Sequence, residues 1–393
     1  MHQSATDPPP RVLHLAQPVD GGVARVVVDL VRAQLASGLD VTVACPGGAL
    51  ADDAAALGAG VRHWRASRSP GPGLWSEVRG LARLLDEVRP DLVHAHSAKA
   101  GLAGRLALRG RVPTVFQPHA WSFEAVGGVT AALALRWERW GARWASRLVC
   151  VSEAERRTGE RSGIAGRWSV VANGVDARRF RPARVGAVRT ALPALAELPP
   201  SAPLVVCVGR LCRQKGQDVL LDAWSTIVTQ LPGARLVLVG DGPDLDELRS
   251  RAPESVLFTG AVEDTVPWYQ AADLVVLPSR WEGMALAPLE AMACGRPVVV
   301  TDVDGARESL PPGLAGRCLV PPGSPAALAE AVTGLLRDPL LRESLGERAR
   351  RYVLSTHDVR HTAEQFADVY RDLLGHGAAA LVEPTECRES IHS

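Results

Sequence analysis

The chain has 393 residues, 47% of them hydrophobic, and its formal net charge is +1. This length exceeds one typical domain and suits two, each with enough apolar residues for a core of its own. No apolar run approaches the ~20 residues of a membrane-spanning helix, and the near-neutral charge gives no indication of a nucleic-acid partner.

The chain ends and the cysteines predict a cytoplasmic protein. Residues 1–10 are polar and rich in proline, and they lack the apolar core of a signal peptide. The seven cysteines are scattered without paired or metal-ligand spacing, as is typical of reduced thiols in a cytosol. We expect residues 1–10 and 376–393 to form disordered tails.

Charge is distributed unevenly along the chain. Residues 1–185 contain 25 Lys and Arg against 16 Asp and Glu, a net charge of +9, whereas the remainder has 19 against 27, a net charge of −8. The asymmetry suggests two domains with different surroundings, the basic one facing an anionic membrane surface or a phosphate-bearing acceptor. Compositional bias alone is the competing interpretation.

Residues 11–185 are predicted to form a first α/β domain. Strand-like apolar runs lie at 11–17, 41–45, 90–96, 114–123, 148–153 and 169–176, and helical segments at 24–37 and 74–88 separate the first of them. Gly21 and Gly22 follow the first strand, and because neither has a Cβ atom the backbone there can approach a ligand closely. An ordinary turn between strand and helix is the plainer interpretation.

Polar residues follow two later strands, at the edge where a parallel sheet binds ligands. Ser97 and Lys99 come after the strand at 90–96, in what we interpret as a loop, and His119 follows the strand that starts at Thr114. Polar loop residues at such an edge are often functional, although a structural loop histidine is the alternative for His119.

Two further histidines, His94 and His96, lie within the strand at 90–96. We expect them to point to opposite faces of the strand, which would make them poor joint ligands for a metal. Packed core histidines are the simpler interpretation for both.

Three tryptophans, Trp137, Trp140 and Trp144, recur on one face of a predicted helix and are interleaved with arginines. Packing of this aromatic stripe against the protein is the commoner arrangement and our preferred interpretation. The alternative is a helix in a membrane interface, with tryptophan among the headgroups and arginine on their phosphates.

The segment 178–200, rich in Arg, Pro and Ala, is interpreted as the linker to a second α/β domain at 186–355. The first strand of that domain, 203–209, runs into a loop where Arg210 and Lys215 bracket a turn. Two cations at the carboxyl edge of a sheet can hold a diphosphate and stabilise it as it leaves. A solvated loop is the alternative interpretation.

The stretch 271–301 reads as a strand, a loop, a short helix and a second strand. Glu282 lies on the loop, and we place Glu290 in the first turn of the helix. The free backbone N–H groups of residues 284–286 would face a phosphate, helped by the helix dipole. Carboxylates repel a phosphate, so the two glutamates should accept hydrogen bonds from sugar hydroxyls. A nucleotide-sugar offers two sets of hydroxyls, on the ribose and on the transferred sugar.

The run from Glu282-Gly-Met-Ala-Leu to Glu290 resembles the E-x7-E motif of retaining glycosyltransferases of the GT-B fold, in particular family 4. The resemblance extends over residues 11–374, and its motifs occur in the family's order. It implies two Rossmann-like α/β domains that face a cleft, with the acceptor on the first, 11–185, and the donor on the second, 186–355. A last helix, 356–375, would cross back to the first domain.

The resemblance also implies the residues of the donor site. These are Gly21, Gly22, Arg210, Lys215, Val262, Glu282, Gly283, Met284, Ala285, Leu286 and Glu290. The glycine pair would lie under the diphosphate, the two cations would hold it, and Val262 would lie beside the base.

Catalysis would rest on His119, Glu282, Arg210 and Lys215, by the same resemblance. Glu282 would hold the hydroxyls of the transferred sugar, His119 its far end, and Glu290 the ribose. Ser97 and Lys99 would face the acceptor, by similarity to members that build lipid-linked polysaccharides.

The activity implied is transfer of a sugar from a UDP- or GDP-sugar to an acceptor hydroxyl with retention of configuration. No metal or other cofactor is expected, because family 4 needs none and Asp302-Val-Asp304, though it looks like a metal-binding pair, lies beyond Glu290. A polyprenyl-linked acceptor, met in peripheral contact with the inner face of the membrane, is the preferred partner. Alternatives are a soluble small-molecule acceptor, and an epimerase or non-catalytic nucleotide-sugar binder on the same scaffold.

Overall fold

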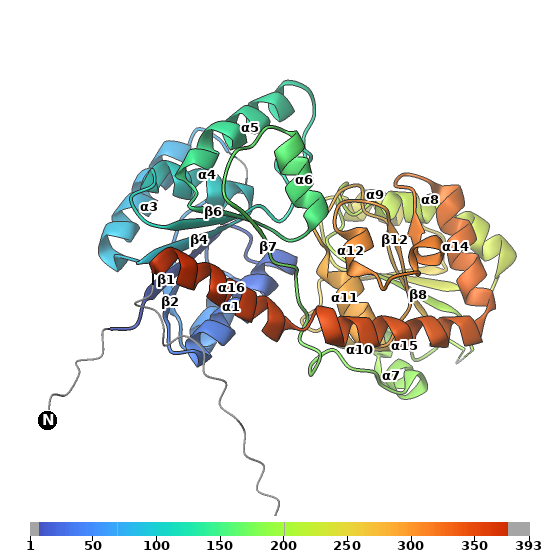
Figure 1. The fold of residues 1–393 in the computed structure, drawn as a ribbon. Coiled ribbons are helices and arrows are strands. Elements are labelled where there is room, and N and C mark those ends of the chain that lie inside the picture. The colour runs from blue at the N-terminus through green and yellow to red at the C-terminus, as the bar shows by residue number, and fades with distance from the viewer. Residues whose placement is uncertain (1–7, 69, 200, 376–393) are drawn as a thin grey trace, which may run out of the picture.

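The computed structural model describes residues 8–68, 70–199 and 201–375, and it shows two α/β units, each built on one parallel sheet (Figure 1). The tails predicted at 1–10 and 376–393 lie, except for residues 8–10, outside the described residues. Among the helices of the described part of the chain, none is both long and apolar enough to cross a membrane.

The first unit contains a seven-stranded sheet in the order β3-β2-β1-β4-β5-β6-β7, in which every neighbouring pair is parallel. Its elements are β1 (Arg11–Ala16), α1 (Gly21–Ala36), β2 (Asp40–Cys45), α2 (Ala49–Ala56), β3 (Gly60–His63), α3 (Leu74–Val88), β4 (Leu92–His96), α4 (Ser97–Leu108), β5 (Thr114–Gln117), α5 (Gly128–Gly141), η1 (Ala142–Trp144), β6 (Arg147–Cys150), α6 (Glu153–Arg161) and β7 (Trp168–Val170). The strand order reverses between β1 and β4, and open α/β sheets bind ligands at the carboxyl edge of such a point.

The second unit contains a six-stranded parallel sheet in the order β10-β9-β8-β11-β12-β13, which reverses between β8 and β11. Its elements are α7 (Val185–Ala191), η2 (Pro193–Leu195), β8 (Leu204–Val208), α8 (Gln217–Gln230), β9 (Arg235–Val239), α9 (Leu245–Arg251), β10 (Val256–Gly260), α10 (Val266–Ala271), β11 (Leu274–Leu277), α11 (Leu286–Ala293), β12 (Val298–Thr301), α12 (Ala306–Ser309), α13 (Ala315–Cys318), β13 (Leu319–Val320), α14 (Pro325–Arg337) and α15 (Pro339–Thr356). Every residue of β8 and β11 is buried, as expected of central parallel strands covered by helices on both faces.

The chain returns to the first unit through α16 (Val359–Leu374), which lies beside α1 (Figure 1). The segment that leaves the first unit after β7 pairs with the segment that returns just before α16. There the N–H of Val175 donates to the carbonyl of His357 at 2.8 Å. Phe366 and Tyr370 of α16 are each 1% exposed, so the helix buries its apolar side on the first unit. α16 therefore links the last helices of the second unit to the sheet of the first.

The segment 178–200 is more than a linker, and that part of our prediction was wrong. It contains α7 and η2, and α7 packs beside α10 on the second unit. Arg189 accounts for this arrangement, because its buried guanidinium donates to the carbonyl of Ala271 at 2.9 Å and to Asp273 at 2.8 Å. An arginine-rich composition does not reveal which arginine finds buried acceptors.

Candidate active site

The loops on either side of the strand-order reversal in the second sheet hold the predicted donor residues. Arg210 and Lys215 lie between β8 and α8, and Glu282 lies between β11 and α11. In the first sheet, Gly21 and Gly22 follow β1 at the equivalent reversal. Parallel topology thus brings residues that are far apart in sequence to the carboxyl edges of both sheets.

Glu282 is the centre of a buried polar cluster. Lys215 Nζ lies 2.5 Å from Glu282 Oε1, and Ser279 Oγ donates to the same oxygen at 2.7 Å. The Gln214 amide donates to the carbonyl of Trp281 at 3.1 Å and so ties the two loops together. Because Glu282 is only 8% exposed, the ammonium and the carboxylate neutralise each other largely away from water. A ligand can bind both groups if it offers an anion to the Lys215 ammonium and hydroxyls to the Glu282 carboxylate.

Glu290 is the fifth residue of α11, not a first-turn residue as we predicted, because the helix begins at Leu286. Tyr269 Oη donates to Glu290 Oε2 at 2.6 Å, which leaves the other carboxylate oxygen for a ligand. Burial raises the pKa of Glu290, whereas the Tyr269 hydroxyl and the charges of Arg25 and Arg179 act in the opposite direction.

Glu290 also lines a pocket of about 360 Å³ between the two units. The walls of the pocket come from α1 and α2 on one side and from segment 174–180, Glu263 and α11 on the other. Val262, the predicted neighbour of the base, precedes Glu263 and is half-buried against the core. The volume lies within the range of ordinary small-ligand sites.

The glycine turn after β1 meets the start of α11 directly. A Cβ atom on Gly22 would lie 3.7 Å from Leu286 Cδ1, so the glycine turn lies close to the Leu286 side chain of the second unit. Gly21 has a φ of +72°, which favours glycine. Met284 and Leu286 are buried, and Ala285 lines a small cavity beside Glu282.

His119 and Ala120 have left-handed backbone conformations, with φ values of 58° and 115°. Such conformations are costly for non-glycine residues and persist only where the surroundings hold them. Glu155 stabilises the His119–Ala120 turn, because its carboxylate accepts the N–H of Ala120 at 2.6 Å and the N–H of Val151 at 2.7 Å. Burial raises the pKa of Glu155 to about 7.

Gly283 lies against this strained turn. A Cβ atom on Gly283 would be 2.8 Å from the Val151 side chain and 3.1 Å from the nitrogen of Ala120, so only glycine fits. The loop that carries Glu282 therefore meets the loop that carries His119.

Lys99 is buried rather than exposed to a ligand. α4 begins at Ser97, so the segment that we interpreted as a loop is the first turn of a helix. Lys99 Nζ lies 2.6 Å from Glu77 Oε2, and the two side chains are 3% and 9% exposed. The ion pair connects α4 to α3, and a role for Ser97 and Lys99 on the acceptor side stays a prediction.

Arg68, Tyr269 and Glu155 are site residues that the sequence interpretation missed. Partial burial and the charge of Arg210 lower the pKa of Arg68, although Arg68 is an exposed residue. Neither arginine forms an ion pair within the described part of the chain. No sequence signal connects Arg68 with Arg210, or Tyr269 with Glu290, because each pair forms only in the folded chain.

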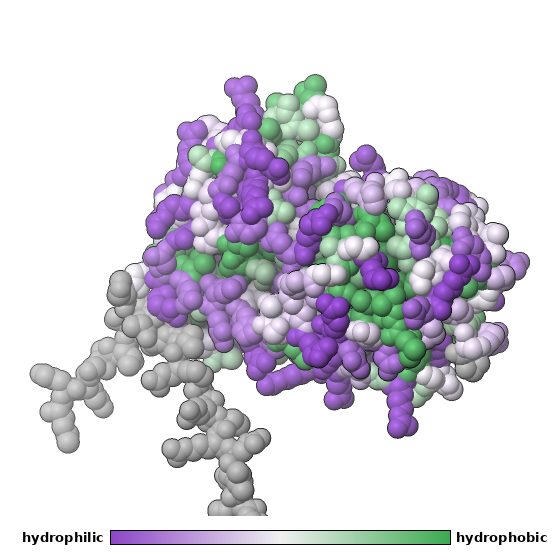
Figure 2. All heavy atoms as spheres, turned by 45° about the vertical axis from the view of Figure 1, so that its right-hand side comes forward, coloured by the Kyte–Doolittle hydropathy of each residue, from purple (hydrophilic) through white to green (hydrophobic). Residues whose placement is uncertain are grey.

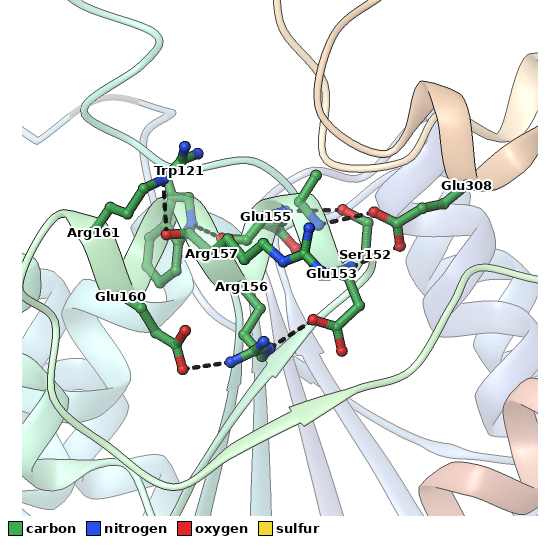
Figure 3. Close-up of polar contacts among 10 residues, drawn as sticks. Trp121, Ser152, Glu153, Glu155, Arg156, Arg157, Glu160, Arg161 and Glu308 are labelled. Carbon is green, nitrogen blue, oxygen red and sulfur yellow. Dashed lines mark hydrogen bonds and ion pairs between the residues drawn. The ribbon is translucent and has the colours of Figure 1, made fainter. Parts of the chain in front are cut away.

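The N-terminus of α6 is hydrogen-bonded to the second unit (Figure 3). Glu308 of α12 accepts the N–H groups of Glu153 and Ala154 at 2.7 and 2.8 Å, an arrangement that the helix dipole favours. Ser152 Oγ donates to the carbonyl of Gly283 at 3.0 Å. The contacts hold the two units together around the meeting point of the two loops.

The Asp302–Asp304 pair takes part in protein contacts. Asp302 forms an ion pair with Arg307, and Asp304 accepts the Thr158 hydroxyl of α6 at 2.7 Å. Asp304 thus belongs to the same set of contacts between the units.

His94 and His96 do not point to opposite faces, and that prediction was wrong. Side chains two residues apart in a strand share a face, and the two rings stack with centroids 3.9 Å apart. His14 of β1 joins them from the neighbouring strand, and ring nitrogens of all three lie within 4.8 Å of one another. All three histidines are fully buried.

Two parallel-sheet units that meet at their carboxyl edges, with Glu282, Arg210 and Lys215 on loops and Glu290 on α11 beside a pocket between the units, define a glycosyltransferase of the GT-B fold. A family model described as Glycosyltransferase Family 4 matches residues 20–179, and one described as Glycosyl transferases group 1 matches residues 202–338. The chain belongs to glycosyltransferase family 4, which confirms the resemblance found in the sequence.

Named relatives agree with this assignment. An alpha-maltose-1-phosphate synthase of Mycolicibacterium smegmatis is 31% identical over 389 residues, which cover 90% of this chain and 96% of that protein. A UDP-Gal:alpha-D-GlcNAc-diphosphoundecaprenol alpha-1,3-galactosyltransferase of Escherichia coli is 28% identical over 316 residues, 75% of this chain and 78% of that protein. Among solved structures, Anabaena HepE in complex with UDP and glucose has a TM-score of 0.78 at 24% identity, over 92% of this chain and all of that one.

Proposed function

We propose that this glycosyltransferase moves a sugar from a UDP- or GDP-sugar to an acceptor hydroxyl with retention of the anomeric configuration. The observation that carries the proposal is the Lys215–Glu282 pair, with Glu290 on the same stretch and the His119 loop against it. A cation for the diphosphate and a carboxylate for the sugar are thus adjacent in a water-poor site. The solved neighbour described with UDP and glucose supports a uridine donor.

The proposed reaction breaks the bond between the anomeric carbon and the diphosphate oxygen and forms one to the acceptor oxygen on the same face. The acceptor proton passes to the departing diphosphate. Lys215 and Arg210 stabilise the charge that develops on that diphosphate, which is the largest contribution that such a site makes. Glu282 binds the sugar hydroxyls, His119 the far end of the sugar, and Glu290 the ribose. With two cations in place, we propose that no metal is required.

Nucleoside diphosphates should stabilise the protein against heat, and EDTA should not reduce the effect. A ligand at about 100 times its Kd contributes about 2.7 kcal/mol to the free energy of unfolding. Glu290→Gln should weaken nucleotide affinity about 10-fold, because a charge-assisted hydrogen bond to the ribose is lost. Glu330→Gln, at an exposed position on α14, is the matched control.

Thermal shifts and calorimetry with UDP, GDP and ADP test this prediction. If no nucleotide stabilises the protein, the proposed donor site is wrong, and wild-type affinity in Glu290→Gln would remove that residue from it. Release of nucleoside diphosphate from the matching nucleotide-sugar separates a transferase from a non-catalytic binder. The NMR coupling of the new anomeric proton reports whether configuration is retained.

We further propose that the acceptor is lipid-linked and that α5 lies on the membrane surface that presents it. Val129 and Leu133 on α5 are 77% and 62% exposed, and Trp140 on the same face is 42% exposed. Figure 2 shows hydrophobic side chains gathered on the upper end of the first unit, where Figure 1 places α5. Exposed Arg136 lies on this face, and the net charge of +9 on residues 1–185 favours an anionic bilayer. The named Escherichia coli relative acts on a diphosphoundecaprenol-linked sugar.

Vesicles rich in phosphatidylglycerol should bind the protein, and vesicles of phosphatidylcholine should bind it at least 10-fold more weakly. Flotation measures both. The double variant Val129→Glu/Leu133→Glu should lose most of the binding, because charged side chains cannot enter the interface without desolvation.

Leu340→Glu is the matched control, because Leu340 is 78% exposed but lies on α15 of the second unit. Equal loss of binding in the control and the double variant would contradict docking through α5. Failure of the wild-type protein to bind either vesicle would favour the soluble acceptor.

A further inference from the structure

The turn that carries His119 is held by the first turn of α6. Glu155 Oε1 accepts the N–H of Ala120 at 2.6 Å, and the backbone carbonyl of Glu155 accepts the indole N–H of Trp121 at 2.8 Å (Figure 3). Glu155 Oε2 accepts the N–H of Val151, directly after β6, at 2.7 Å. Glu155 and Trp121 are 0% and 1% exposed, so water cannot readily replace these partners. One residue of α6 therefore connects both residues that follow His119 to the end of β6.

This turn depends on such a partner because its backbone is strained. His119 and Ala120 have φ values of 58° and 115°, and neither is a glycine. Two successive left-handed residues persist only where their surroundings hold them. Hydrogen bonds from backbone N–H groups to an ionised carboxylate are about twice as strong as neutral ones. The Glu155 carboxylate therefore decides where the backbone of the turn lies, and the ring of His119 lies with its Nε2 3.2 Å from His96 Nδ1.

The second unit contacts the first at the same carboxylate. A Cβ atom on Gly283 would lie 2.9 Å from Glu155 Oε1 and 3.1 Å from the nitrogen of Ala120, so the backbone of Gly283 packs on their hydrogen bond. Ser152 Oγ accepts the N–H of Glu155 at 3.0 Å and donates to the carbonyl of Gly283 at 3.0 Å. Because Gly283 directly follows Glu282, the position of the Glu282 loop relative to the His119 turn depends on Glu155.

The groups that face Glu155 from other elements carry negative charge or none. Glu124 lies between β5 and α5, Asp304 lies before α12 on the second unit, and Cys150 ends β6 with a thiol whose pKa is raised by burial. Among the described residues, none forms an ion pair with Glu155. Burial raises the pKa of Glu155 to about 7, the charges of Glu124 and Asp304 act in the same direction, and its two N–H partners act against it. Glu155 therefore gains a proton as the pH falls through about 7.

We propose that Glu155 is a positioning residue, whose ionised carboxylate fixes the His119–Ala120 turn in the conformation that packs on Gly283. This conformation sets His119 relative to Glu282, the two residues that contact the transferred sugar in the proposed function, on which this inference rests. A protonated carboxyl carries a donor on one oxygen and accepts an N–H only weakly there, so a proton on Glu155 releases one of its two backbone partners. Sugar transfer consequently requires the ionised form.

A purely structural contact is the rival interpretation, in which Glu155 only anchors α6 to β6. That role predicts a loss of stability at every pH and no separate effect on turnover. A positioning role predicts that turnover follows the charge of Glu155. Nucleotide binding, which the proposed function assigns to the second unit, should not follow it.

Glu155→Gln tests the proposal at pH 8, where the wild-type carboxylate is ionised. The amide keeps one acceptor and turns a donor towards the second N–H, so one of the two hydrogen bonds is lost. Turnover should fall about 100-fold, the usual cost of displacing a catalytic group by about 1 Å. The Kd of the nucleoside diphosphate that binds best should stay unchanged. Hydrogen exchange followed by mass spectrometry should become faster in the peptide 118–124 and not in a peptide from β1.

The pH dependence of turnover provides a test that leaves the Glu155 contacts intact. Wild-type turnover should decline as the pH falls through about 7. Glu124→Gln removes a negative charge that raises the pKa of Glu155, so the decline should move to lower pH while turnover at pH 8 is retained. Glu155→Gln should lose this decline, because it lacks the titrating group.

Glu153→Gln is the matched control, because Glu153 also lies in the first turn of α6, but its side chain is 45% exposed and pairs with Arg156. It should keep turnover within about 3-fold. Wild-type turnover in Glu155→Gln at pH 8 would overturn the proposal, and so would an equal loss in the control. A decline that disappears in Glu124→Gln but persists in Glu155→Gln would also overturn it, because Glu124 would then be the titrating group.

These failures differ from a failure of the proposed function. They are measured on a wild-type protein that binds a nucleoside diphosphate and transfers the sugar of the matching nucleotide-sugar. A wild-type protein that does neither would overturn the proposed function, and the positioning role of Glu155 with it.

Discussion

Lys215→Met should lower turnover by about 100- to 1,000-fold, the usual cost of removing one preorganised group that stabilises developing charge. The Lys215 ammonium lies 2.5 Å from Glu282 in a cluster with little water access, where a charge acts on a diphosphate more strongly than it would in solvent. Methionine keeps the length and apolar volume of the side chain and removes the charge. Steady-state kinetics with the donor that binds best would measure the loss.

The same substitution should also reduce stability, because it leaves the Glu282 carboxylate without its cation. Ser279 still donates at 2.7 Å, so we expect a cost of about 1–3 kcal/mol rather than unfolding. The double variant Lys215→Met/Glu282→Gln should recover most of that stability and none of the activity. Recovery of activity in the double variant would show that the single substitution acted through stability.

Arg213→Met is the matched control for charge on this loop. Arg213 is exposed two residues before Lys215, and its guanidinium lies over the Trp281 ring at 5.6 Å. It should retain turnover within about 3-fold, as exposed charges contribute little. Near-normal turnover in Lys215→Met would remove Lys215 from the proposed mechanism.

The sequence is most informative where a property is local. Strand burial and turn conformation depend on adjacent residues, so the sequence revealed the apolar run at 274–277 and the glycine turn after the first strand. The two acids that follow the run at 274–277 could be recognised as well. Parallel topology then dictates that the loops after successive strands share one edge. These two facts place Lys215 and Glu282 at one edge of the second sheet, whereas the ion pair between them was not predicted.

Partners that form only across the fold could not be predicted in this way. Glu290 is bonded to Tyr269, and Tyr370 reaches His94 from the far end of the chain. Lys99 was assigned to the acceptor by similarity to members that build lipid-linked polysaccharides, and the sequence did not reveal that Glu77 on the preceding helix neutralises it. Charge neutralisation depends on which helices pack together, and helical periodicity does not specify that.

Separately, Glu138→Leu should destabilise the protein by about 3–5 kcal/mol, since it leaves a buried guanidinium without its anion. Arg105 Nη2 lies 2.7 Å from Glu138 Oε2, and the two side chains are 0% and 2% exposed. Arg105 also donates to the carbonyl of Gly101 at 2.8 Å and lies over the Phe116 ring at 3.9 Å. The pair connects α4 to α5, the helix that we propose docks on the membrane.

Urea unfolding would measure a double-variant cycle of Glu138→Leu, Arg105→Met and both together. The double variant should lie within about 2 kcal/mol of the wild-type protein, because an apolar pair of similar size avoids the desolvation of both ions. Arg251→Met is the matched control, since the Arg251–Asp222 pair also joins two helices but its side chains are 40% and 50% exposed. It should cost less than about 1 kcal/mol.

A stable double variant would also separate two roles of the buried pair. If it floats with anionic vesicles as the wild-type protein does, the pair serves only to hold α5 against α4, and an apolar contact replaces it. If it is stable but no longer floats, the charged pair orients α5 so that Val129 and Leu133 face outward. An additive cycle, with both single variants mild, would contradict the buried-charge argument itself, because coupling between two groups 2.7 Å apart in a water-free site cannot vanish.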